Sequence, residues 1–263
     1  MKTITIATVP FHPLTREQVL DHLDRALNNG QQLFCVTPNP EICLIAMRDP
    51  EFAELLNTAQ LSLPDGFGVL WAGRYLAGKP SLLRWMGTLL SPGKTVRVSP
   101  FPERVTGTDI MQAFFKRFPK RKVFLLGASE KVSQKLADQL RESGVNIVGH
   151  LSGDDSAAKE PGIRKMIQNS GAEVLFVAFG APRQERWIAR NLPHLKSVQV
   201  AMGIGGAFDF LAGERKRAPL WMRRSGLEWL FRLVIEPRRI KRIFNATVVF
   251  PWKILISRKK SLF

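Results

Sequence analysis

The sequence predicts an α/β fold, with a Rossmann-like parallel sheet flanked by helices and a basic amphipathic helical C-terminal appendage. Short apolar runs alternate with segments of helical periodicity over most of the length, which is typical of parallel strands covered by helices. Positive charge gathers near the C-terminal end. We therefore expect an α/β catalytic domain over residues 1–214 and a membrane-associating appendage over residues 215–263.

The apolar runs predict the strands of the parallel sheet in order along the chain. These strands are expected near residues 3–8, 33–37, 61–63, 122–126, 146–148, 173–179 and 197–202. Helix signals separate them: Thr15 precedes a helical run that Gly30 closes, a further helix covers residues 110–118, and another over residues 130–143 ends at Gly144.

The composition excludes several classes of protein. Hydrophobic residues make up 45% and charged residues 23% of the chain, which is ordinary for a globular protein and excludes disorder. Cys35 and Cys43 lie in apolar stretches without the spacing of a zinc site, so we expect reduced core thiols. No signal peptide is evident, and the longest apolar run near the C-terminal end, residues 246–257, is shorter than the roughly 20 residues that span a bilayer. We expect a cytoplasmic protein, peripheral on the inner face of the cell membrane.

Residues 215–263 carry 14 Lys and Arg against two Glu, which is +12 of the chain's net charge of +17. Such a surface attracts polyanions, whether nucleic acid, anionic lipid or a phosphate-bearing substrate. Trp and Phe alternate with these cations, which favours a membrane-surface helix over a solvated helix docked on the core.

Polar residues follow two neighbouring strands, at the edge where ligands bind in open α/β sheets. Asp65 follows the strand near residues 61–63 and precedes Gly66, so it is either a general base or a turn-forming Asp. Thr37 and Asn39 follow the preceding strand among prolines, where they can orient a substrate group or simply form a turn.

Two glycine-rich loops lie between a strand and a helix. The backbone amides around Gly127, and around Gly205 and Gly206, can hold a diphosphate. Neither loop has the Gly-x-Gly-x-x-Gly fingerprint, because Phe208 stands at the third glycine position, and no Walker motif occurs. These loops argue mildly against a dinucleotide enzyme or an ATPase.

The sequence has no Asp-x-Asp triplet of the kind that holds a metal ion on a sugar nucleotide. We therefore expect no metal and no cofactor, and other cations must neutralise a departing diphosphate. Arg232, Arg238, Arg239 and Arg242 can do so, because guanidinium groups bind phosphate oxygens bidentately.

Together these segments resemble the WecG/TagA/CpsF family of bacterial glycosyltransferases, glycosyltransferase family 26. The matching segments occur in order: Thr-Pro-Asn-Pro-Glu (37–41), Leu-Pro-Asp-Gly-Phe-Gly-Val (63–69), Glu-Arg-Val-Thr-Gly-Thr-Asp (103–109), Val-Ala-Phe-Gly-Ala-Pro-Arg-Gln-Glu (177–185), Gly-Ile-Gly-Gly-Ala-Phe-Asp (203–209), Arg-Ala-Pro (217–219), Gly-Leu-Glu-Trp-Leu-Phe-Arg-Leu (226–233) and Glu-Pro-Arg-Arg (236–239). Residues 79–102 depart from the family pattern as an insertion, which reads as a buried helix with a surface loop or as a membrane-facing or acceptor-facing lid.

The resemblance implies a metal-independent, inverting transfer of a sugar, typically of the N-acetylmannosamine type, from a UDP-sugar to an undecaprenyl-diphosphate-linked acceptor. It implies Asp65 as the catalytic base with Thr37 and Asn39 beside the reacting sugar, a donor contact from Gln184, and a weaker nucleotide contact from Asp209. It also implies that tail arginines close over the UDP diphosphate, and that the protein forms homo-oligomers. The matching arginines are Arg232, Arg239 and Arg242.

Two other classes remain as alternatives. A nucleic-acid-binding protein would explain the charge but leaves the polar strand ends without a role. A Rossmann-type oxidoreductase would explain the alternation of strands and helices but lacks the glycine fingerprint. We expect UDP-sugar and lipid-linked acceptor as partners, and no nucleic acid.

Overall fold

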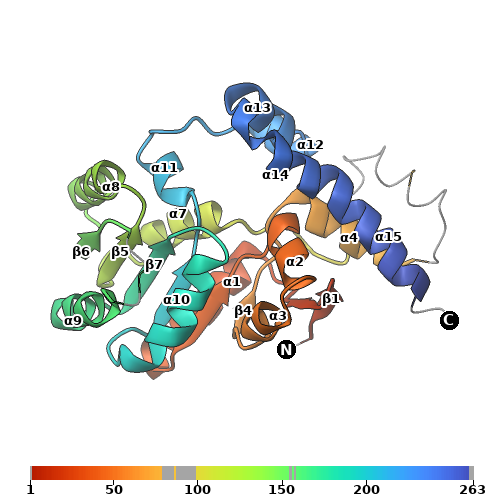
Figure 1. Cartoon of the computed structure of the whole chain (residues 1–263). Coiled ribbons are helices and arrows are strands. Elements are labelled where there is room, and N and C mark those ends of the chain that lie inside the picture. Colours follow the sequence, from red (N-terminus) through yellow and green to blue (C-terminus); the bar gives the residue numbers. More distant parts are fainter. Residues whose placement is uncertain (1, 79–85, 87–98, 154–155, 157, 261–263) are drawn as a thin grey trace.

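The computed structural model describes residues 2–78, 86, 99–153, 156 and 158–260 (Figure 1). A six-stranded sheet with strand order β4-β3-β8-β7-β5-β6 forms its centre, and every paired strand in it is parallel. Its strands are β3 (Leu33–Val36), β4 (Leu61–Ser62), β5 (Val123–Gly127), β6 (Ile147–Leu151), β7 (Val174–Ala178) and β8 (Val200–Gly203). The predicted fold class is thus confirmed.

The N-terminal strand is the exception, because the prediction that residues 3–8 join the parallel sheet is wrong. β1 (Ile4–Ile6) pairs antiparallel with β2 (Val9–Phe11) in a separate two-stranded sheet. The two residues between them, Ala7 and Thr8, have φ of 51° and 70°. Positive φ at both central residues is the geometry of a tight hairpin, normally marked by Asn-Gly, so Ala-Thr carries no sequence signal for it.

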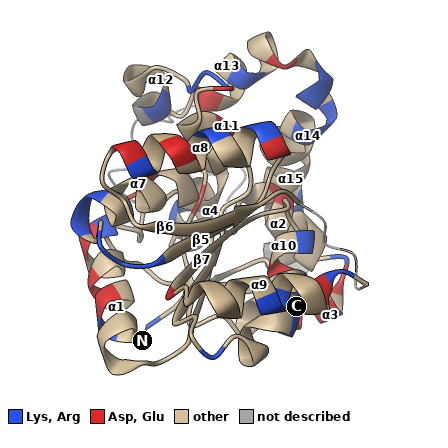
Figure 2. Ribbon diagram, turned by 90° about the vertical axis from the view of Figure 1, so that its left-hand side faces the viewer, with Lys and Arg blue, Asp and Glu red and all other residues tan. Residues whose placement is uncertain are grey.

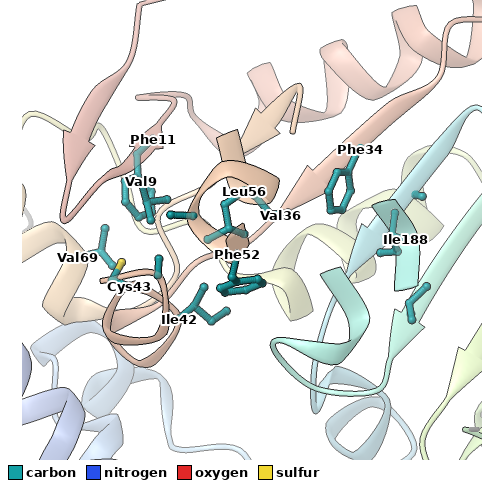
Figure 3. Close-up of a cluster of buried hydrophobic side chains, with 14 of the residues drawn as sticks. Val9, Phe11, Phe34, Val36, Ile42, Cys43, Phe52, Leu56, Val69 and Ile188 are labelled. Carbon is teal, nitrogen blue, oxygen red and sulfur yellow. The ribbon is translucent and has the colours of Figure 1, made fainter. Parts of the chain in front are cut away.

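Side chains that alternate along the strands build one hydrophobic core on each face of the sheet. Phe34 and Val36 of β3 belong to one core, whereas Leu33 and Cys35 belong to the other. The first core is covered by α2 (Pro40–Ala46), α3 (Pro50–Asn57), α4 (Phe67–Leu76), α9 (Glu160–Ser170) and α10 (Arg183–Asn191), and part of it is drawn in Figure 3. The second is covered by α1 (Arg16–Asn29), α7 (Gly107–Arg117), α8 (Glu130–Glu142) and α11 (Ala207–Leu211).

The helix boundaries follow local capping chemistry. Thr15 and Gln18 form a capping box at the start of α1, and Gly30 ends this helix in the left-handed conformation, as predicted. Helix α7 begins earlier than expected, because Thr106 accepts a hydrogen bond from the Asp109 amide and caps it.

The C-terminal segment is a chain of short helices, which we call the tail (residues 215–260). It contains α12 (Leu220–Ser225), α13 (Glu228–Ile235), the 3-10 turn η2 (Pro237–Arg239), α14 (Ile240–Phe244), the π-helix η3 (Asn245–Val249) and α15 (Phe250–Lys260). A further 3-10 turn, η1 (Leu192–His194), follows α10 in the domain. α12 and α14 carry basic residues, whereas α8 carries both signs (Figure 2).

The end of the tail is part of the domain core. Phe250, Ile254 and Leu255 of α15 are buried against α2 and α4, and α15 lies beside α4 in Figure 1. Within the described part of the chain, no helix is both long and apolar enough to cross a membrane. The insertion predicted at residues 79–102 lies mostly outside the described residues.

Candidate active site

A pocket of about 450 Å³ opens between the carboxyl ends of β3 and β4 and the tail. Asn39 and Asp65 line it from the domain, and Arg232, Arg239 and Arg242 line it from the tail. Five of the predicted site residues are therefore brought together from segments far apart in the sequence. Arg238 is exposed and does not line this pocket.

Asp65 reaches the pocket because β4 ends at Ser62, three residues before it, and a turn leads from Asp65 into α4. Its amide donates to the Pro38 carbonyl at 3.2 Å, and Gly66 follows with φ of 98°. Among the described residues, none donates a hydrogen bond to the Asp65 carboxylate, so its oxygens are available to a ligand. Burial raises the pKa of Asp65 from 3.8 to about 6.

Charged neighbours of both signs surround this carboxyl group. Arg104 and Arg232 act to lower the pKa of Asp65, whereas Glu228 and Asp109 act to raise it. A carboxylate with a pKa near 6 is ionised at neutral pH and still basic enough to accept a proton from a hydroxyl group as bond formation proceeds.

Asn39 and Thr37 have different positions relative to the pocket. The Asn39 Oδ1 accepts from the amides of Glu41 and Ile42 at 2.9 and 3.1 Å and caps α2, while the side chain lines the pocket. Thr37 is buried behind it, and its hydroxyl donates to the Gly203 carbonyl at 3.3 Å. Thr37 therefore connects the ends of β3 and β8.

At the pocket, ion pairs at two points hold the tail over the domain. Glu228 at the start of α13 accepts from Arg104 Nη1 at 3.0 Å and from Arg232 Nη2 at 2.8 Å. Arg242 donates from Nε and Nη2 to the two oxygens of Glu41 at 2.8 and 2.9 Å. This bidentate geometry is the same one that guanidinium groups use toward phosphate.

Further contacts fix the remaining pocket arginines. Arg239 pairs with Glu236 at 2.6 Å. The Arg232 guanidinium lies 5.3 Å from the Phe210 ring centroid, a cation–π contact that joins α13 to α11. Each of the three predicted phosphate-binding arginines thus has a carboxylate partner in this structure.

The other predicted residues follow the ends of β5, β7 and β8 and do not line this pocket. Gln184 ties two of these loops together, because its Oε1 accepts from the amides of Gly180 and Gly205 at 3.1 and 3.0 Å. Its Nε2 donates to Glu185 at 2.8 Å, and both side chains are buried. The role of Gln184 toward a donor stays a prediction.

The two glycine-rich loops differ in how much space surrounds their glycines. Gly127, with φ of 111°, packs against the Ala178 backbone, where an added Cβ would stand 2.7 Å from the carbonyl carbon. Gly205, with φ of 51°, has open space on its Cβ side, and Gly206 is exposed. Asp209 pairs with Arg215 at 3.6 Å. The substrate contacts of these glycines and of Asp209 stay predictions.

Sequence reasoning missed the roles of Arg104, Glu41 and Glu228. All three lie in the segments that carried the family resemblance, and this location could have indicated that they belong to the site. Their pairing with tail or domain partners depends on tertiary structure and has no local pattern. Among the described residues, no group of three or more His, Cys, Asp or Glu is arranged to hold a metal ion.

Comparisons with known proteins identify a family and similar enzymes. A family model described as "Glycosyl transferase WecG/TagA/CpsF family" matches residues 4–93 and 93–262. The chain is 29% identical over 249 residues to the N-acetylglucosaminyldiphosphoundecaprenol N-acetyl-beta-D-mannosaminyltransferase of Bacillus subtilis (strain 168), covering 93% of this chain and 88% of that protein. It is 30% identical over 262 residues to the protein of the same name from Staphylococcus aureus (strain MRSA252), covering 98% and 94%.

Proposed function

This chain belongs to the WecG/TagA/CpsF family of glycosyl transferases, and on that premise we propose that it transfers an N-acetylmannosamine-type sugar from a UDP-sugar to an undecaprenyl-diphosphate-linked saccharide, with inversion and without a metal. Such a reaction serves the synthesis of cell-surface polysaccharide or teichoic acid. The enzyme class disfavours the nucleic-acid-binding and oxidoreductase alternatives.

The observation that carries this proposal is Asp65, a carboxylate with raised pKa that accepts no side-chain or backbone hydrogen bond from the described residues, in a pocket that Arg104 and three tail arginines also line. Inverting transfer needs one base to take the proton of the acceptor hydroxyl while the nucleotide diphosphate leaves from the opposite face of the sugar. In this proposal Asp65 is that base, Asn39 orients the sugar, and the arginines neutralise the diphosphate. Thr37 supports the same edge from behind through Gly203.

The strand order supports a place for the nucleotide. The chain leaves β5 for β6 on one side and leaves β7 for β8 on the other, so the crossover direction reverses between β5 and β7. Ligands of open α/β sheets bind at such a reversal, beyond the carboxyl ends of the strands. Gly127, Gln184 and Gly205 lie at these ends, and we assign the uridine half of the donor to them, with the diphosphate directed toward the tail.

Exposed apolar and basic side chains on the tail support membrane docking. Trp221 and Val234 are 64% and 73% exposed, and further large apolar residues on the tail are exposed beside its cations. The purpose of this surface, in our proposal, is to bind the anionic inner face of the cell membrane, where the lipid-linked acceptor is held. In the absence of lipid, a second copy of the chain would cover the same apolar residues, which supports self-association.

The test of the reaction is a transfer assay with purified protein. UDP-N-acetylmannosamine and N-acetylglucosaminyl-diphosphoundecaprenol should give a lipid-linked disaccharide and UDP, with other UDP-sugars compared in parallel. Asp65→Asn serves as the inactive control. Absence of product from every UDP-sugar tried with this acceptor would exclude the proposed function.

The test of the membrane surface is sedimentation with anionic liposomes. Trp221→Ser combined with Val234→Ser should weaken binding, whereas Met166→Ser, which alters a 49% exposed residue on α9, should not. Deletion of the tail is a poor test, because it also removes the buried residues of α15. Equal binding by the double variant and the control would contradict membrane docking through this surface.

A further inference from the structure

Glu228 holds one arginine of the domain and one arginine of the tail at the same time. Its Oε2 accepts from Arg104 Nη1 at 3.0 Å and its Oε1 accepts from Arg232 Nη2 at 2.8 Å. The side chains of Arg104 and Glu228 are each only 15% exposed, so this pair is well shielded from solvent. Among the described residues, no other carboxylate joins an arginine of residues 1–214 to an arginine of the tail.

All members of this group border the pocket that contains Asp65. Desolvation acts to raise the pKa of Glu228, but Arg232, Arg104 and Arg217 outweigh it and hold that pKa below its usual value, so Glu228 is an anion at neutral pH. Arg104 is the charged neighbour with the largest effect on Asp65. Without Glu228, this guanidinium group would still act on Asp65, which lines the same pocket, and would have no carboxylate partner of its own there.

An ion pair between Arg104 and Asp65 would harm a base in two ways. It would occupy the carboxylate oxygens that must reach the acceptor hydroxyl, and it would lower the pKa of Asp65 and so weaken it as a base. Arg232, once released from Glu228, would also lose its fixed direction at the pocket, since only the contact with Phe210 would then hold it.

We propose that Glu228 is a positioning residue: it keeps Arg104 off the Asp65 carboxylate and fixes Arg232 at the pocket, so that the base is free only when the tail is docked. This inference rests on the proposed function for its catalytic meaning, whereas the effect of Glu228 on Asp65 is a property of the folded chain itself. In this proposal Asp65 acts as a base only while the tail is docked, and the side chain of Glu228 links the two.

The charged groups that face Asp65 give the direction of the expected pH effect. Arg104 and Arg232 lower its pKa, and Glu228 and Asp109 raise it. Replacing Glu228 by Gln removes one group that raises the pKa and releases two that lower it. All of these changes act in the same direction, so the ionisation of Asp65 should move to lower pH.

The experiment compares wild-type protein, Glu228→Gln and the control Glu214→Gln. Glu214 is matched because it also bridges two cations, Lys131 at 3.3 Å and Lys135 at 2.8 Å, but does not line the pocket. The carboxyl titration of Asp65 is followed by carbon NMR, assigned by its absence in Asp65→Asn, and the pH profile of kcat is measured alongside. Thermal unfolding confirms that each variant is folded.

For Glu228→Gln we expect the titration midpoint of Asp65 to move to lower pH, and the acid limb of the kcat profile to move to lower pH with it. We also expect kcat at pH 8 to fall on the order of 10- to 100-fold, because a catalytic group is misplaced. Glu214→Gln should match wild type in all three. Glu228→Asp keeps the charge and should restore the midpoint toward wild type.

Two results would overturn the inference. One is a Glu228→Gln protein whose Asp65 midpoint equals that of wild type; if its melting temperature and kcat fall nonetheless, the role of Glu228 is purely structural. The other is a Glu228→Gln protein whose midpoint is lower but whose kcat at pH 8 equals that of wild type. Failure of the proposed function is seen separately, as a wild-type protein that makes no lipid-linked product while its Asp65 still titrates.

Discussion

Replacing Asp65 by Asn is expected to reduce transfer strongly and to stabilise the folded chain. The change keeps the shape of the side chain and removes the charge that burial disfavours. The folded chain holds the pKa of Asp65 at about 6, against 3.8 without the fold. This difference corresponds to at most about 3 kcal/mol of free energy of unfolding, since each pKa unit is worth 1.36 kcal/mol.

The sign of this effect follows from the raised pKa. Between about pH 4 and pH 6 the unfolded chain loses the Asp65 proton before the folded chain does, so the wild-type protein loses stability as pH rises through this window. Above pH 6 the loss is complete and constant. Asn does not titrate, so the stability gain of the variant should be near zero at pH 4 and largest at pH 8.

The assay is urea unfolding of both proteins at pH 4 and pH 8, together with the transfer assay. We expect the variant to gain up to about 3 kcal/mol at pH 8 only, while turnover falls by a factor of about 10² to 10⁴, the usual contribution of a general base. A variant that retains turnover would remove Asp65 from the mechanism. A variant that is equally or less stable at pH 8 would refute the argument that burial of its charge costs stability.

Four further outcomes are expected. Wild-type kcat should rise between pH 5 and pH 7 around a midpoint of about 6 and level off above it, and a flat profile would be inconsistent with the pKa of Asp65. Gly127→Ala should lower the melting temperature, with a loss on the order of 2 kcal/mol or more, because its φ is 111° and the new Cβ would approach the Ala178 backbone; unchanged melting would contradict this packing. Glu41→Gln should lower the free energy of unfolding in urea by less than about 1 kcal/mol, because Arg242 is largely exposed. The same change should strengthen UDP binding measured by calorimetry, because Glu41 no longer competes with the diphosphate for Arg242; weaker binding would show that no such competition exists. A chelator should leave transfer unchanged, and activity restored by a divalent cation would disprove metal independence.

The sheet and its polar edge could be predicted because both follow from local patterns. Apolar runs of strand length and capping residues such as Thr15 are short-range signals, and the rule that ligands bind beyond strand ends selected Asp65 and Asn39 without tertiary information. The hairpin around Ala7 could not be predicted in this way, because its turn lacks the glycine or asparagine that usually marks it.

The charge pairing of the site lay beyond sequence reasoning for a physical reason. Glu41 and Arg242 are 201 positions apart, and nothing local specifies which of many arginines a given carboxylate meets. Arg104 was visible only as part of a segment resembling a family. The membrane role of the tail is a prediction that liposome sedimentation addresses, and the donor contact of Gln184 is a prediction from the family resemblance.

The tail is fastened to the domain at both ends. Near its start Arg217 pairs with Asp109 at 2.7 Å, and near its end Phe250 and Ile254 are buried in the core. Because the tail is attached at both ends, its middle undocks only by breaking contacts such as that of Glu228 with Arg104. Force applied at Trp221, which lies between these two attachments, therefore acts on α7 through Asp109 and on α2 and α4 through α15, and these last two helices flank Asp65.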